Sequence, residues 1–170
     1  IQEFAAPSAL AALRADLPED SRVHLDDKPL PFKWYPLTRM VDFDVGIIRH
    51  LMGGDPSRMR GFGSQIAQYD LNRVFRLVLR VAVSPALALR SISSIYQAYF
   101  DPGDLRFTDV GPREGQLRLH ESAMPAYLCE HGYSGFVDEL LRRTGAPHAR
   151  CEHTTCAHRG DAGCVWKCTW

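Results

Sequence analysis

The sequence predicts an α+β fold in which four or more helices pack on an antiparallel sheet made of two C-terminal hairpins split by a helix. Three observations predict it. Apolar residues recur at a spacing of about 3.6 from Tyr35 to Tyr99, the spacing changes to 2 after Asp101, and helical spacing returns once after Pro125. Helices followed by hairpins are typical of proteins in which helices cover an antiparallel sheet.

The N-terminal stretch, residues 1–33, is rich in proline, alanine and charge, and it predicts only a short helix around Ser8 to Ala15. The first four residues lack an initiator Met and a signal-peptide pattern and are typical of a cloning remnant, so we expect a chain cut from a longer protein. A length of 170 residues is ordinary for one domain. We therefore expect an N-terminal extension over 1–33 and a single α+β domain over 34–170.

Two helices are predicted at the start of that domain. The first runs from about Tyr35 to the pair Gly53-Gly54, which stops it. The second begins with Asp55 as N-cap and Pro56 at the first helical position. Its apolar residues fall on one face: Met59, Phe62, Ile66 and Tyr69.

Two more helices follow. The third is predicted from about Leu71 to Val81. The fourth begins with Ser84 as N-cap and Pro85 at the first position, and it continues through Tyr99.

The first hairpin follows from alternation. Leu105 and Phe107 alternate with polar residues, residues 111–115 make a reversal, and Leu117 and Leu119 alternate in the same way. This pattern predicts a hairpin with one solvent-facing side.

The last part of the chain predicts a helix and a second hairpin. The helix begins at Pro125 and ends at Gly145. Its apolar face comprises Cys129, Tyr133, Phe136, Val137, Leu140 and Leu141. Two short strands near 148–153 and 164–170 enclose a turn at 159–163.

Composition excludes several classes of protein. Twenty Lys and Arg balance 20 Asp and Glu, which argues against a nucleic-acid partner. The longest apolar stretch, 74–89, is interrupted by charges and a proline, so no transmembrane segment is expected. Five cysteines are an odd number and cluster near the end of the chain, which favours a reduced, cytoplasmic protein with a metal site over a disulfide scaffold.

The clustered cysteines predict a zinc site. Zinc takes about four nitrogen or sulfur ligands in a tetrahedron, and Cys156 and Cys164 flank a glycine-rich reversal that can bring their thiolates together. His153 can reach the same ion from the preceding strand, and Cys129 can reach it from the packed helix. Cys151 is an alternative to His153, and ordinary buried thiols or a disulfide are the alternative to a metal.

These residues also carry a resemblance to a known family. The carboxyl half of the 4-vinyl reductase domain resembles residues 126–168 through Cys129, the segment 132–136 (Gly-Tyr-Ser-Gly-Phe), His153 to Cys156, and Arg159 to Cys164. Domains of this family are sensors in phenol-responsive transcriptional activators. Their fold is distantly similar to that of heme-nitric-oxide domains and of a core subunit of the TRAPP vesicle-tethering complex. The segment 34–36, Trp-Tyr-Pro, with the helical middle resembles a myxobacterial branch of the same fold.

The resemblance implies a specific ligand set for zinc. In the phenol sensors the ligands are a Cys on the last helix, two Cys on either side of a Gly-Asp turn, and an acid. The acid lies three residues before the Cys that precedes the turn. Cys129, Cys156 and Cys164 match the cysteines, whereas His153 stands at the position of the acid. That departure leaves Glu152, as well as Cys151, as a rival for the fourth ligand position.

The resemblance further implies an apolar cavity between helices and sheet. A cavity lined by aromatic rings with a few polar groups suits a small hydrophobic or phenolic ligand. The candidate lining residues are Phe62, Tyr69, Tyr96, Tyr99, Phe107 and Tyr133. A filled core is the alternative interpretation of the same aromatic residues.

Heme and catalysis have weaker support. His50, at the end of an apolar helix, is the best heme-ligand candidate, but the Tyr-x-Ser-x-Arg signature of heme-nitric-oxide domains is missing, which argues against heme. No nucleophile elbow, zinc-protease motif, phosphate loop or dinucleotide motif occurs, so we expect no enzyme.

The sequence thus predicts a non-enzymatic sensory or regulatory domain with a structural zinc and a small hydrophobic or aromatic ligand. It would act on a protein partner or a fused output domain, and a homodimer is compatible with this role. The alternative is a protein-interaction or dimerisation module, like the TRAPP subunit, without an exchangeable ligand.

Overall fold

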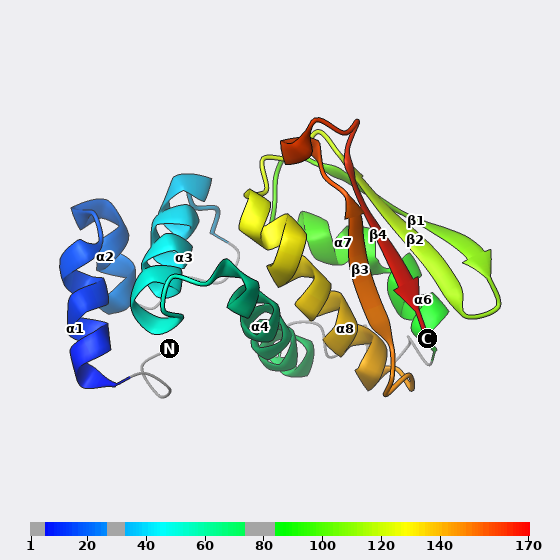
Figure 1. The fold of residues 1–170 in the computed structure, drawn as a ribbon, viewed down its shortest axis with the longest axis horizontal. Coiled ribbons are helices and arrows are strands. Elements are labelled where there is room, and N and C mark those ends of the chain that lie inside the picture. The colour runs from blue at the N-terminus through cyan, green and yellow to red at the C-terminus, as the bar shows by residue number, and fades with distance from the viewer. Residues whose placement is uncertain (1–5, 27–32, 74–83) are drawn as a thin grey trace. The chain divides into compact units, whose positions relative to one another are not determined.

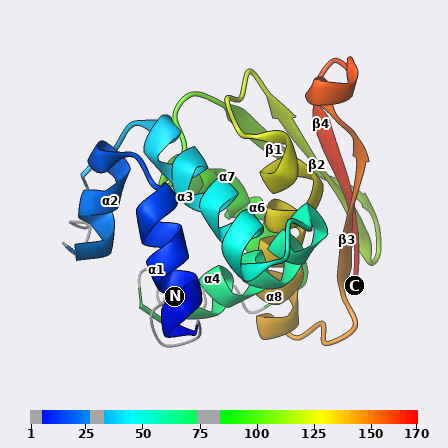
Figure 2. The same ribbon diagram turned by 60° about the vertical axis from the view of Figure 1, so that its left-hand side comes forward.

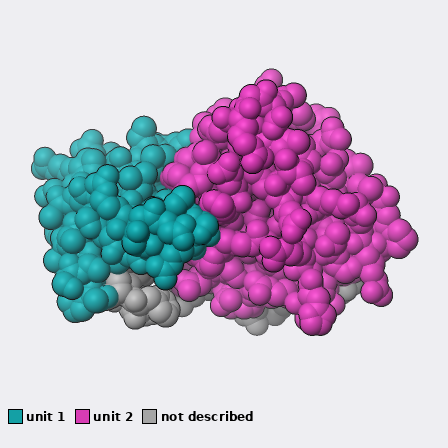
Figure 3. Space-filling model, viewed as in Figure 1, with its two compact units in different colours: residues 1–58 teal, residues 59–170 magenta. Residues whose placement is uncertain are grey.

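The computed structural model describes residues 6–26, 33–73 and 84–170, and the chain divides into two compact units, residues 1–58 and 59–170 (Figures 1 and 3). The division of the chain into an extension over 1–33 and a domain over 34–170 stays a prediction. In the described part of the chain, no helix has both the length and the apolar character needed to cross a bilayer.

The first unit is helical. It contains α1 (Pro7–Asp16), α2 (Glu19–Asp26), α3 (Leu37–Leu51) and the 3-10 turn η1 (Pro56–Arg58). Both α1 and α2 contact α3, and Figure 2 shows α1 beside α3. Leu13, Leu17 and Ile47 are buried, so these helices share an apolar interior. The sequence predicted α1 and α3 but not α2.

The second unit contains the sheet and the remaining helices. The helices are α4 (Met59–Arg73), α6 (Pro85–Arg90), α7 (Ile92–Gln97), the π-helical turn η2 (Leu128–Gly132) and α8 (Tyr133–Arg143). Ser84 caps α6 as predicted, because its hydroxyl accepts a hydrogen bond from the Leu87 N–H at 3.4 Å. The predicted fourth helix is interrupted at Ser91, whose hydroxyl donates to the Leu87 carbonyl and competes with the helix backbone.

The sheet has four antiparallel strands. They are β1 (Asp104–Gly111), β2 (Glu114–His120), β3 (Arg150–Thr155) and β4 (Cys164–Thr169), in the order β1-β2-β4-β3. The two hairpins therefore join through β2 and β4. Helices α6 and α7 contact β1, while α8 contacts β3 (Figure 1). The predicted α+β fold, two hairpins split by a helix, is confirmed.

Helix α4 packs against α8 through small residues. A Cβ atom on Gly63 would lie 2.0 Å from the Gly132 carbonyl oxygen, and one on Gly135 would lie 1.8 Å from the Arg60 carbonyl oxygen. Only glycine allows the two backbones to approach this closely. Two glycines of the segment that resembles the 4-vinyl reductase domain therefore have a packing role.

The buried face of α4 differs from the predicted one. Met59, Gly63, Ala67 and Leu71 are buried at every fourth position, whereas Ile66 and Tyr69 are 37% and 57% exposed. The prediction followed the largest side chains, but the close contact with α8 selects the small ones. The predicted third helix begins within α4, and its residues 74–81 lie outside the described residues.

Candidate metal centre

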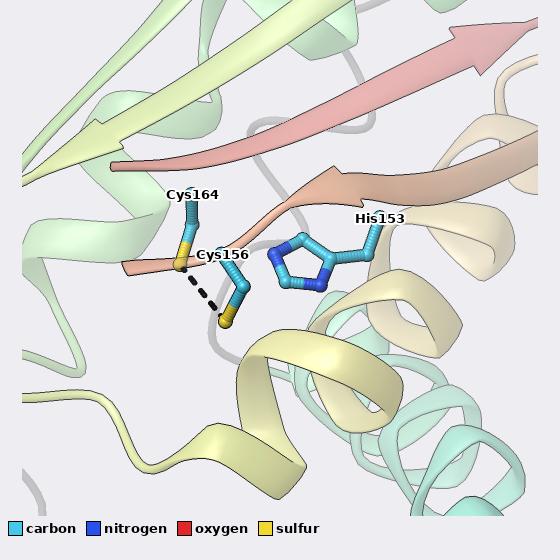
Figure 4. A group of neighbouring side chains, drawn as sticks. All are labelled: His153, Cys156 and Cys164. Carbon is cyan, nitrogen blue, oxygen red and sulfur yellow. Dashed lines mark hydrogen bonds between the residues drawn. The ribbon is translucent and has the colours of Figure 1, made fainter. Parts of the chain in front are cut away.

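Three predicted ligands meet at one end of the second hairpin. His153 belongs to β3, Cys156 follows that strand, and Cys164 begins β4. Their ligand atoms all lie within 4.8 Å of one another, and the two sulfur atoms are 3.9 Å apart. Figure 4 shows the imidazole ring of His153 beside the two thiols. Both cysteines are buried.

The turn between the strands brings the two cysteines together. The Cys156 N–H donates to the Asp161 carboxylate at 2.7 Å, and the Asp161 N–H donates to the Cys156 carbonyl at 3.3 Å. Gly160 has a φ of +90°, a conformation that glycine adopts without strain. The Thr155 hydroxyl also donates to the Gly163 carbonyl at 3.2 Å. Local hydrogen bonds thus hold both thiols at the same end of the hairpin.

His153 has no hydrogen-bond partner in the described structure, although both of its ring nitrogens are buried. Its ring lies against Trp166, with ring centres 4.8 Å apart. Burial lowers the pKa of His153, and the positive charge of Arg159 lowers it further. A neutral imidazole is the form that binds metal ions, and a buried nitrogen without a partner is costly unless something binds it.

Cys129 lies next to this group, in the π-helical turn η2. Burial raises the pKa of its thiol, and the neighbouring thiols of Cys164 and Cys156 raise it further. Its sulfur is not within 4.8 Å of all three other ligand atoms. The Trp166 indole N–H donates to the Cys129 carbonyl at 3.0 Å and so ties the turn to β4. Such π-helical turns are frequent at functional sites.

The rival ligands lie elsewhere. The Glu152 side chain is 64% exposed and pairs with Arg150 at 2.9 Å, and Glu152 alternates with His153 along β3. The Cys151 sulfur lies against Cys168. His153 is therefore the candidate that the fold brings to Cys156 and Cys164.

The heme-ligand candidate His50 lies in the first unit. Its Nε2 atom is 3.1 Å from the Asp16 carboxylate, which also pairs with Arg49 at 2.5 Å. The described contacts of this imidazole are thus those of an ion-pair cluster.

The six predicted pocket residues are not all buried. Tyr96 and Tyr133 are buried and meet edge to face with ring centres 6.4 Å apart. Phe62 and Phe107 are half-buried, while Tyr69 and Tyr99 are exposed. The Tyr99 hydroxyl donates to the Asp70 carboxylate.

Three further aromatic residues complete the cluster around Tyr133. Phe136 stacks on Tyr133, and the ring centre of Trp166 lies 5.0 Å from that of Tyr133. Phe100 stacks on Tyr96. Helix periodicity placed Phe136 and Tyr133 on one apolar face, but nothing in the sequence showed that this face meets Trp166.

Two hydroxyl groups in this cluster differ in their partners. The Tyr96 hydroxyl hydrogen-bonds to Ser122 at 2.7 Å. The Tyr133 hydroxyl is buried without a partner among the described residues. Burial raises the pKa of Tyr133, so the hydroxyl is neutral. It is a donor available to a bound molecule.

Comparisons with known proteins identify the fold. No family model matches the chain, and no curated protein matches it in sequence. An H-NOX protein from K. algicida matches with a TM-score of 0.71 and 8% identity, over 99% of this chain and 89% of that one. An H-NOX protein from S. oneidensis in the Fe(II)NO ligation state matches with a TM-score of 0.63 and 17% identity, over 95% and 87%. The chain has the fold of H-NOX domains.

A vinyl-4-reductase family protein from Methanocaldococcus jannaschii matches with a TM-score of 0.45 and 15% identity, over 96% of this chain and 92% of that one. The family that the sequence resembles, and the heme-nitric-oxide fold to which that family is distantly similar, both occur among the structural neighbours. The heme-nitric-oxide fold expected from the resemblance is confirmed by the H-NOX neighbours.

Proposed function

We propose that this chain is a non-enzymatic sensory or regulatory domain in which a structural zinc ion fixes one end of the β3–β4 hairpin. One observation carries the proposal: the half-buried imidazole of His153, whose two ring nitrogens are buried with no hydrogen-bond partner among the described residues, lies within 4.8 Å of two buried thiols. With Zn–S bonds of about 2.3 Å in a tetrahedron, two ligating sulfur atoms lie about 3.8 Å apart. The separation of 3.9 Å between Cys156 and Cys164 fits this geometry.

His153, Cys156 and Cys164 would be three of the zinc ligands, with Cys129 as the fourth. Zinc binding would hold the cysteines as thiolates, against the burial that otherwise keeps the Cys129 thiol protonated. Because the ligands come from η2, β3 and β4, the ion would join these three elements, and its binding would contribute to the stability of the fold.

The second part of the proposal is a small hydrophobic or aromatic ligand at the Tyr96–Tyr133 cluster. The buried Tyr133 hydroxyl supports it, because the oxygen of a phenol could accept that hydrogen bond while its ring packs on the neighbouring rings. Trp166 contacts both Tyr133 and His153. A ligand that moved Tyr133 would therefore act on the metal end of the hairpin, where a protein partner or a fused output domain could respond.

Metal analysis of the chain purified under reducing conditions tests the first part. We expect about one zinc ion per chain, and stoichiometric absence of metal contradicts it. An absorption spectrum recorded on the same sample tests for heme, and we expect no Soret band. One heme per chain would instead favour a gas-binding sensor.

Thermal unfolding with a panel of phenols, indoles and fatty acids tests the second part. A ligand that binds only the native state raises the melting temperature in a saturable way. A response that Tyr133→Phe weakens supports the ligand site. The absence of any response favours the protein-interaction module.

A further inference from the structure

The five cysteines form two groups. Cys129, Cys156 and Cys164 lie at the metal end of the hairpin, whereas Cys151 and Cys168 lie directly opposite each other on β3 and β4. The sulfur atoms of Cys151 and Cys168 are 2.6 Å apart, compared with 3.9 Å between Cys156 and Cys164. Both Cys151 and Cys168 are fully buried. No proposed zinc ligand belongs to this second pair.

The backbone of Cys151 is bound from outside the sheet. Its N–H donates to the Asp138 carboxylate at 2.6 Å, and its carbonyl accepts from the Arg60 guanidinium at 2.8 Å. Arg60 and Asp138 also form an ion pair at 2.6 Å. The Arg60–Asp138 clamp thus joins α4 and α8 to the edge strand β3.

These two backbone bonds show how the two cysteines face each other. In an antiparallel ladder, a residue whose N–H and C=O both point away from the neighbouring strand belongs to a non-hydrogen-bonded pair. Cα atoms in such a pair lie about 4.5 Å apart, and the side chains are at their closest. A disulfide needs Cα atoms roughly 4.4–6.8 Å apart. Cys151 and Cys168 can therefore form a bond without a large movement of the backbone.

We propose that Cys151 and Cys168 are a reversible dithiol–disulfide pair, a redox modification site separate from the metal centre. A low-molecular-weight disulfide such as oxidised glutathione is the oxidant. One protein thiolate attacks it, forms a mixed disulfide and releases one glutathione thiol. The second protein thiolate then attacks the protein sulfur of the mixed disulfide and releases the second glutathione. The cysteine pair loses two electrons and two protons, and the oxidant becomes two thiols.

Oxidation would act on the hairpin that carries the metal centre. The bond joins residues 17 positions apart and closes a loop that contains His153, Cys156 and Cys164. Such a bond restricts the unfolded chain, so the oxidised protein should be the more stable form. We expect its melting temperature to rise by on the order of 10 °C.

Equilibration of the folded chain in glutathione buffers of different redox ratio tests the proposal. The protein is then denatured so that its buried thiols become accessible, free thiols are blocked with iodoacetamide, and the product is measured by intact mass and peptide mapping. We expect five blocked cysteines in the reduced form and, in oxidising buffer, three blocked cysteines with Cys151 linked to Cys168. Five blocked cysteines at every ratio, or links that involve Cys129, Cys156 or Cys164 instead, overturn it.

Matched variants separate the pair from the metal ligands. Cys168→Ala should abolish the link, whereas Cys156→Ser should retain it. If Cys168→Ala fails to fold, the peptide map of the chain without substitutions still tests whether the link forms. The zinc content of the same samples is measured in parallel, so a Cys151–Cys168 link in zinc-free protein contradicts the proposed function without contradicting this inference.

Discussion

The two ends of the β3–β4 hairpin place pairs of cysteines in different surroundings. At the metal end, Cys156 and Cys164 lie 3.9 Å apart beside a histidine whose buried nitrogens have no described partner. At the other end, Cys151 and Cys168 lie 2.6 Å apart, and no histidine or acid joins them in a group of metal ligands within the described residues.

The backbone explains this difference. At the metal end, a turn held by Asp161 places the sulfur atoms of Cys156 and Cys164 3.9 Å apart. At the other end, the strand register places Cys151 directly opposite Cys168, and the Arg60–Asp138 clamp binds the backbone groups of Cys151 that point away from β4. Whether two nearby cysteines favour a metal or a bond thus depends on the elements that hold their backbones.

The largest expected effect comes from loss of the metal. Cys156→Ser should release zinc and lower the melting temperature by about 10 °C or more, because metal binding and folding are coupled. The matched control is Cys168→Ala, which should keep a full complement of zinc. Equal zinc loss in both variants would show that the two ends of the hairpin do not have separate roles.

The second-largest effect on stability is expected at Gly135, where α8 packs closely on α4. Gly135→Ala places a Cβ 1.8 Å from the Arg60 carbonyl oxygen and must push α4 away from α8. We expect a loss of about 3 kcal/mol in the free energy of unfolding, measured by urea titration. Gly61→Ala is the control, since nothing lies within 4 Å of that position, and it should gain up to about 1 kcal/mol. Similar results for the two would mean that α4 and α8 are not in close contact.

Sequence periodicity predicted most of this architecture. The two hairpins and α8 were visible because alternation and helical spacing persist over whole elements. The buried stripe of α4 could not be predicted in this way, because Gly63 and Ala67 carry no hydrophobic signal. The partner of Gly63, Gly132, lies 69 residues further along the chain.

The candidate site was predictable to a similar degree. Spacing brought Cys156 and Cys164 together, since both flank one turn. The pairing of Cys151 with Cys168 depends on strand register, and the Arg60–Asp138 clamp depends on tertiary contacts. Neither leaves a local pattern in the sequence.

A smaller effect is expected for the charge of the clamp. Asp138→Asn keeps an acceptor for the Cys151 N–H but leaves the half-buried Arg60 without its counter-ion, at a cost of about 1–2 kcal/mol. Glu152→Gln breaks the exposed pair with Arg150 on the same strand and should change stability by less than about 0.5 kcal/mol. Urea titration of both variants measures the difference. A cost for Glu152→Gln as large as that for Asp138→Asn would contradict the role given to the clamp.

The smallest effect is expected at Tyr133, whose ring packs on Trp166 between the two ends of the hairpin. Removing a buried hydroxyl that has no partner in the described part of the chain removes a desolvation cost, so Tyr133→Phe without ligand should be neutral or up to about 1 kcal/mol more stable. Tyr96→Phe loses a hydrogen bond to Ser122 and should cost about 1 kcal/mol. Thermal unfolding of the two variants, with and without a phenol, separates them. If Tyr133→Phe is clearly destabilising in ligand-free protein, its hydroxyl already has a partner, and the ligand site loses its main support.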